Sequence, residues 1–168
     1  MLLAFTAHPA SAQTYETEHG GVSLKIVADG LDHPWGLAFL PDGTMLVSER
    51  DPGSLRLATP NGAVRPPLKG TPEAYTSGQG GMLDIAIDPD FKNNNLIYFS
   101  YAEPGEGGAG TAVARAKLDQ SGNALNDVTV IFQQVPKTSG GRHFGSRLVF
   151  SPEGQLYITV GERGERDR

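Results

Sequence analysis

WGLAFLPDGTMLVSER, residues 35–50, contains two strand-like runs separated by the turn sequence Pro-Asp-Gly. Apolar residues fill the first run and β-favouring residues fill the second, which is typical of an antiparallel pair of strands around a tight turn. The same strand, turn and strand recur in MLDIAIDPDFKNNNLIYFS at 82–100 and in SRLVFSPEGQLYITVGER at 146–163. In the middle copy Phe91 replaces the glycine, and three asparagines lengthen the turn.

The spacing of the three copies indicates a repeat fold. Pro41, Pro89 and Pro152 mark the three turns and are separated by 48 and 63 residues, whereas a β-propeller blade takes roughly 40 to 50 residues plus insertions. A β-sandwich also uses short strands, but it does not predict a recurring strand-turn-strand unit. The sequence therefore predicts an all-β propeller, of which this chain covers about three blades.

Other segments complete the predicted strand pattern. Further strand candidates lie between the copies at 54–59, 111–118 and 128–135. The glycine-rich segment 103–110 separates two predicted strands and is interpreted as a surface loop.

Composition excludes several classes of function. The 168 residues carry 14 Lys and Arg against 19 Asp and Glu, a net charge of -5 without a basic run, so no nucleic-acid partner is expected. The absence of cysteine removes disulfides, thiolate metal sites and cysteine nucleophiles. The chain has no dinucleotide fingerprint, phosphate-binding loop, HExxH or GxSxG motif. No apolar run approaches the ~18 residues of a membrane span.

The two ends of the sequence bear on cellular localisation and on the extent of the domain. Residues 1–12, MLLAFTAHPASA, combine a short apolar run with the small-residue pattern that signal peptidase accepts, and are expected to be the remnant of a signal peptide. Periplasmic or secreted localisation follows from that expectation. Because the chain stops at Arg168 directly after a strand-like run, residues 13–168 are expected to be the N-terminal half of a propeller domain and a fragment.

His143 and Gln79 are the candidate site residues that the pattern itself provides. Each stands among glycines directly before the first strand of a repeat, and equivalent loops of a propeller converge on one pocket. A histidine there can take a proton from a hydroxyl near neutral pH, and an amide among glycines can approach a polyhydroxy ligand closely. The alternatives are a loop histidine bonded to backbone and an ordinary turn glutamine.

Charged residues near the repeats have simpler interpretations. Glu49-Arg50 and Glu162-Arg163 recur near the ends of second strands and are interpreted as an inter-blade ion pair, with a catalytic carboxylate as the alternative. Arg147 is expected to contact an anionic cofactor or to pair with a neighbouring acid. Asp84, Asp88 and Asp90 lack the spacing of a calcium loop and are interpreted as turn and solvent-facing residues.

Four ordered motifs resemble one family. HPWGLAFLPDG, LVSERDPGSLRL, GQGGMLDIAIDPDF and HFGSRLVFSPEGQLYITVGERG, between His33 and Arg168, resemble the soluble aldose sugar dehydrogenases that use pyrroloquinoline quinone, the glucose/sorbosone dehydrogenase family. The resemblance implies a six-bladed propeller that oxidises the C1 hydroxyl of an aldose to the lactone. A separate acceptor, such as a cytochrome, a quinone or a dye, would then take the electrons.

The resemblance also implies roles for single residues. His143 would be the general base that takes the C1 hydroxyl proton while hydride passes to the quinone, and Gln79 would line the same pocket near cofactor and substrate. Asp167 falls near a position that approaches the sugar. The groups that bind the calcium ion and grip the quinone would lie beyond residue 168. Arg142 stands where a branch of the family has an acid, so the resemblance does not identify the residue that orients His143. A propeller that only binds carbohydrate or a protein partner is the alternative, and a calcium-dependent propeller lactonase is a further one.

Overall fold

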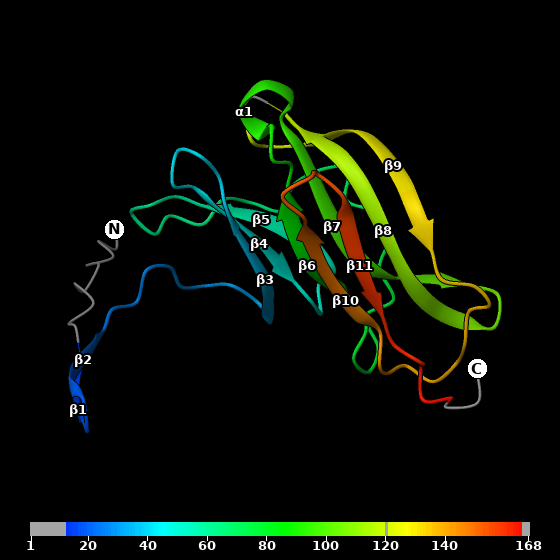
Figure 1. Cartoon of the computed structure of the whole chain (residues 1–168), viewed down its shortest axis with the longest axis horizontal. Helices are drawn as coiled ribbons and strands as arrows, with labels where there is room; N and C mark the ends of the chain where they lie inside the picture. The colour runs from blue at the N-terminus through cyan, green and yellow to red at the C-terminus, as the bar shows by residue number, and fades with distance from the viewer. Residues whose placement is uncertain (1–12, 120, 166–168) are drawn as a thin grey trace, which may run out of the picture.

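The computed structural model of the chain describes residues 13–119 and 121–165. The expected signal-peptide remnant at 1–12 and the candidate Asp167 lie outside the described residues. Within them, the predicted all-β class is confirmed: three antiparallel sheets lie side by side, and a small hairpin precedes them (Figure 1).

Each sheet contains one copy of the repeat and is called a blade here. Blade 1 consists of β3 (Pro34–Phe39), β4 (Met45–Glu49) and β5 (Ser54–Ala58). Blade 2 consists of β6 (Met82–Ile87), β7 (Leu96–Gly105), β8 (Gly108–Leu118) and β9 (Leu125–Gln133). Blade 3 consists of β10 (Gly145–Phe150) and β11 (Leu156–Val160). In each blade the strands follow one another in chain order, as the repeat predicts.

Two smaller features were not expected from the sequence. The strands β1 (Gln13–Thr17) and β2 (Gly20–Leu24) form the preceding hairpin, and every residue in them is exposed. The asparagine-rich turn of the middle repeat forms the one-turn helix α1 (Phe91–Asn94), which ends at Asn95 in the left-handed conformation that asparagine tolerates better than most residues.

The interpretation of residues 103–110 as a surface loop is wrong. β7 and β8 continue through this segment to the pair Gly105 and Gly108, so only Glu106 and Gly107 form the turn. Gly107 has a positive φ of 85°, a conformation that glycine adopts without strain. The glycines therefore close a tight hairpin here.

The core lies between the blades. β6 packs against β3 on one side and β10 on the other, which makes blade 2 the centre of the described structure. The main apolar cluster joins the inner faces of blades 1 and 2; its fully buried members include Leu46, Leu55, Met82, Ile97, Phe99, Ala112 and Ala114. Because a sheet with one apolar face must bury it against another element, this cluster holds neighbouring blades together.

A hydroxyl group occupies the same place in every blade. The first strand of each blade shifts register near its start, and there the N–H of its third residue donates to a hydroxyl on the second strand. The pairs are Gly36 with Ser48, Asp84 with Ser100 and Arg147 with Thr159, at 2.7, 2.9 and 2.9 Å. Ser48 then donates to the carbonyl of Leu83 in blade 2, and Ser100 donates to the carbonyl of Ser146 in blade 3, at 2.8 Å for the latter.

Replacing Ser100 by alanine is expected to destabilise the protein by about 2–4 kcal/mol, because each buried polar group left without a partner costs about 1–3 kcal/mol. Ser100 is fully buried, and the change leaves both the Asp84 N–H and the Ser146 carbonyl without their hydrogen bond. Urea unfolding measures the difference. Ser23→Ala on the exposed strand β2 is the matched control and should have little effect. Equal stability of the two variants would contradict the linking role of Ser100.

Candidate active site

The two loops that carry Gln79 and His143 meet at one end of blades 2 and 3. Gln79 lies shortly before β6 and His143 shortly before β10, separated by 64 positions in the sequence. The backbone N–H of His143 donates to Oε1 of Gln79 at 2.8 Å, and the N–H of Gln79 donates to the carbonyl of Gly141 at 2.8 Å. The structure therefore brings the two candidate residues together and locks their loops to each other.

The backbone holds His143 in an uncommon conformation. Its φ is +52°, and Gly141 and Gly145 on either side have φ of 57° and 73°. A positive φ is uncommon for a residue with a Cβ atom, and such residues cluster where function requires a particular side-chain direction. Gly161, just after β11, permits the arrangement, since a Cβ atom there would lie only 1.9 Å from the carbonyl oxygen of His143.

Substituting Gly161 by alanine is expected to push the His143 loop out of place and to destabilise the protein by about 1–3 kcal/mol, the usual cost of overpacking. The new methyl group cannot move away, because the atoms it meets are backbone atoms. Thermal or urea unfolding measures the cost. Gly21→Ala serves as control, since its methyl group would meet its nearest atoms at an ordinary 3.5 Å. If both variants unfold alike, the close approach of Gly161 to His143 is not required.

Glu162 orients the imidazole of His143. Oε1 of Glu162 is hydrogen bonded to Nδ1 of His143, and this bond lowers the pKa of Glu162 below its ordinary value. With Glu162 ionised, Nδ1 carries the proton and Nε2 is left as the acceptor. Among the residues that the structure describes, Nε2 of His143 has no hydrogen-bond partner. The side chains of His143 and Glu162 are 48% and 39% exposed, so Nε2 is open to a ligand.

The interpretation of Glu162 as half of an inter-blade ion pair is therefore wrong, and so is its equivalence with Glu49. The register pairs Glu49 with Pro34 and Val160 with Gly145, so Val160 is the counterpart of Glu49 in blade 3. Glu49 is buried and acts within blade 1, where it accepts hydrogen bonds from the Asp32 N–H, the Ser54 hydroxyl and the Arg56 guanidinium at 2.8, 2.6 and 3.2 Å.

Arg163 contacts the residues on both sides of His143. Its guanidinium lies 3.3 Å from the centre of the Phe144 ring and donates to the carbonyls of Arg142 and Ala109. Burial lowers the pKa of Arg163, which is only 3% exposed. Because Phe144 follows His143 directly, this cation–π contact fixes the backbone that carries the imidazole.

A hollow of about 390 Å³ opens beside these residues. Its wall combines aromatic and apolar groups with a few polar ones, as small-molecule sites do. The residues that line it are Trp35, Arg50, Gln79, Leu83, His143, Phe144, Gly145 and Ser146. They come from all three blades, so the hollow is a product of the arrangement of the blades.

His33 has a similar carboxylate contact but a different environment. It also has a positive φ, 46°, and its Nδ1 lies 2.5 Å from Oδ1 of Asp32. Its Nε2, however, lies 3.4 Å from Oδ2 of Asp51, so both ring nitrogens face carboxylates. His143 thus offers a free acceptor nitrogen and His33 does not.

The remaining charged candidates are Arg147 and three aspartates. Arg147 pairs with an acid, as expected: Nη1 lies 2.8 Å from Oδ1 of Asp84. Asp84 is buried, however, and also accepts from the N–H of Leu148 at 2.7 Å, so its interpretation as a turn or solvent-facing residue is wrong. Asp88 and Asp90 do lie in the turn before α1, where the N–H of Asp90 donates to Asp88 at 2.9 Å.

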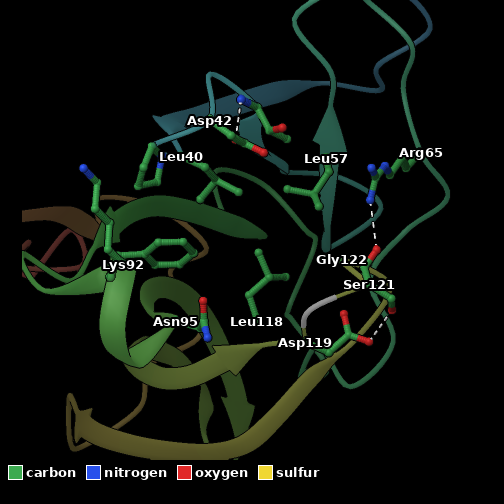
Figure 2. A pocket seen from close by; sticks show the side chains of 13 residues that line it. Leu40, Asp42, Leu57, Arg65, Lys92, Asn95, Leu118, Asp119, Ser121 and Gly122 are labelled. Atoms are coloured by element: carbon green, nitrogen blue, oxygen red, sulfur yellow. Dashed lines mark hydrogen bonds between the residues drawn. The ribbon is translucent and has the colours of Figure 1, made fainter.

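A second hollow, of about 360 Å³, lies at the opposite end of blades 1 and 2, near α1 (Figures 1 and 2). Figure 2 shows Leu40, Leu57 and Leu118 inside it, with charged side chains at the edge. Arg65 donates there to the carbonyl of Ser121 at 3.0 Å. None of the candidate residues lines this hollow.

Residues 13–119 and 121–165 contain neither a cluster of metal-ligating side chains nor a helix fit to span a membrane. No group of three or more His, Asp and Glu side chains there is placed to hold a metal ion. No helix in that part of the chain is long and apolar enough to cross a membrane.

Comparison with known proteins gives one consistent result. The family model described as Glucose / Sorbosone dehydrogenase matches residues 31–168. Aldose sugar dehydrogenase YliI of Escherichia coli is 44% identical over 147 residues, which cover 86% of this chain and 39% of that protein. A crystal structure of glucose dehydrogenase superposes with a TM-score of 0.80 at 46% identity, over 84% of this chain and 41% of that one.

A relative with a bound cofactor is also similar. The PQQ-bound form of Aldose Sugar Dehydrogenase from Streptomyces coelicolor has a TM-score of 0.74 and 31% identity, over 95% of this chain and 45% of that one. The chain thus spans about two fifths of the length of the relatives it matches. The predicted fold is confirmed by these likenesses as a partial β-propeller.

Proposed function

Because the chain belongs to the glucose/sorbosone dehydrogenase family, we propose that this protein is a quinoprotein that oxidises the C1 hydroxyl of aldose sugars to the lactone. One observation carries the proposal: Nδ1 of His143 is held by Glu162, and Nε2 is unpartnered in the described structure beside Gln79. This arrangement is what a general base needs, a fixed tautomer and an open acceptor.

The residues have separate tasks in the proposed reaction. Nε2 of His143 takes the proton of the C1 hydroxyl, and Glu162 stabilises the imidazolium that forms. Gln79 holds the His143 loop through Oε1, while its Nε2, which has no hydrogen-bond partner among the described residues, is free to donate to a sugar hydroxyl. Loss of that proton, together with departure of the C1 hydrogen as hydride, converts C1 to the carbonyl carbon of the lactone. Asp167 remains a predicted contact to the sugar.

The chemistry of the hollow fits pyrroloquinoline quinone, which, when bound, supplies the hydride acceptor. The cofactor carries carboxylates, and the positively charged guanidinium of Arg50 faces the hollow. The Nε–H of Arg50 donates to Oδ1 of Asp51 at 2.7 Å. Gln79 and His143 would border the same group. A calcium ion held by residues beyond 168, a separate electron acceptor and a periplasmic or secreted location complete the proposal. The support for the cofactor is the PQQ-bound relative.

Reduction of a redox dye tests the proposed function. The full-length protein is supplied with pyrroloquinoline quinone, calcium and a panel of aldoses, and dye reduction is followed with and without sugar. Sugar-dependent turnover is the expected result. Tight binding of the quinone without turnover on any aldose would overturn the proposed reaction, and failure to bind the quinone would favour a propeller that only binds carbohydrate or a protein partner.

A further inference from the structure

We propose that Trp35 is the wall against which the sugar ring packs in the hollow beside His143. This inference rests on the proposed function for the identity of the ligand. It goes beyond that function because it assigns a role to a residue in blade 1, remote in the sequence from the candidate base.

The position of Trp35 distinguishes it from its neighbours on the same strand. Trp35, Leu37 and Phe39 all lie on β3 and are 55%, 53% and 64% exposed. A register shift between Pro34 and Leu37 separates Trp35 from the other two. Of the three, Trp35 alone lines the hollow that also contains Gln79 and His143. The exposed aromatic ring therefore stands at the candidate active site, near the start of β3.

The two sides of the hollow match the two kinds of surface on a sugar. An aldopyranose presents hydroxyl groups around its edge and C–H groups on its faces. Gln79 and His143 provide donors and acceptors for the edge, with Arg50 beside them. Trp35 provides a flat apolar surface for a C–H face, and its large area makes it an effective anchor in a binding pocket.

A role in binding has consequences that differ from a role in chemistry. Trp35 has no group that exchanges a proton near neutral pH, so its removal weakens binding of the ground state and of the transition state alike. Such uniform binding appears in KM and leaves kcat nearly unchanged. Trp35→Ala is therefore expected to raise KM for the aldose about tenfold, which corresponds to about 1.4 kcal/mol. Trp35→Phe keeps a flat ring and is expected to recover most of the loss.

Binding can also be measured without turnover. Trp35 is the only tryptophan of the sequence, so a change of indole fluorescence on addition of sugar to the wild type is expected and reports on this side chain. Calorimetric titration of glucose into the protein, without an electron acceptor, gives the dissociation constant for the wild type and for Trp35→Ala. We expect it to rise about tenfold in parallel with KM.

Leu37→Ala is the matched control. Leu37 lies on the same strand with nearly the same exposure as Trp35 but does not line the hollow, so KM and the dissociation constant should not change. An equal rise of KM and of the dissociation constant in both variants would mean that these side chains of β3 serve packing, and it would overturn the proposal. An unchanged dissociation constant in Trp35→Ala would also overturn it. If glucose binds but is not oxidised, weaker binding to Trp35→Ala supports the wall while the proposed reaction fails. If glucose does not bind to the wild type at all, the wall is wrong.

Discussion

Replacing His143 by alanine is expected to lower kcat for sugar oxidation about a thousandfold, within the range that general-base catalysis contributes. The variant removes the nitrogen that takes the C1 hydroxyl proton, and no other imidazole in the described residues has a free ring nitrogen at the hollow. Dye reduction under saturating sugar and quinone measures kcat. Quinone binding, followed by its absorbance, separates loss of the base from loss of the cofactor.

His33→Ala is the control for this change. His33 also has a positive φ and a carboxylate at Nδ1, but it does not line the hollow. Its removal should leave kcat within a few-fold of the wild type. Comparable loss in the two variants, or retention of activity by His143→Ala with the quinone bound, would show that another group takes the proton.

Replacing Glu162 by glutamine is expected to lower kcat about a hundredfold or more, with a smaller effect on KM. The amide can turn its NH2 group towards Nδ1 of His143, which leaves the proton on Nε2 and blocks proton acceptance there. The variant also removes the negative charge that stabilises the imidazolium. Because Glu162 acts through His143, it is a positioning residue, and the ratio of kcat to KM effects is the informative measurement.

The pH profile provides a second measurement for the same variant. Its bond to His143 lowers the pKa of Glu162, so the carboxylate stays ionised through the neutral range, and the stability that the pair contributes is lost only as pH falls through that lowered pKa. In Glu162→Gln this acid titration is removed, so the fall of activity that follows protonation of Glu162 is expected to be absent from the acid side of the profile. Glu73→Gln removes the same charge at an exposed loop position and should leave the profile unchanged. A wild-type profile in Glu162→Gln would exclude the positioning role.

The repeat could be predicted from the sequence because its signals are local. The Pro-Asp-Gly and Pro-Glu-Gly turns, with apolar runs on both sides, specify the first two strands of each blade, and the structure places β3, β4, β10 and β11 there. Gln79 and His143 could be found for the same reason, since each stands among glycines just before such a strand. Their meeting required only that equivalent loops of neighbouring blades converge.

The sequence predicts the wrong partner for Glu162, because the contact that Glu162 makes depends on strand register. Sequence similarity aligns Glu49-Arg50 with Glu162-Arg163. The equivalent hydroxyl groups instead align Ser48 with Thr159, so Glu49 and Glu162 do not occupy equivalent positions in their blades. Glu162 lies beyond the strand, on the backbone that Gly161 brings against His143. The Ser or Thr that recurs on the second strand of each blade is the sequence feature that reveals the difference. An alignment of the repeats on this residue shows that Glu49 and Glu162 are not equivalent.

The hydroxyl of Ser100 lies out of reach of any ligand in the hollow, yet it connects the sheet that follows Gln79 to the strand that follows His143. The spacing of the two loops is therefore supported from the interior of the protein as well as by the hydrogen bonds between the loops. A lineage that adapts to a warmer or colder habitat has a way to stiffen or loosen the site there, by exchanging serine for threonine or alanine at a place that no substrate meets. Temperature adaptation of this fold would then appear as substitutions at the contacts between blades, while the candidate catalytic residues stay the same.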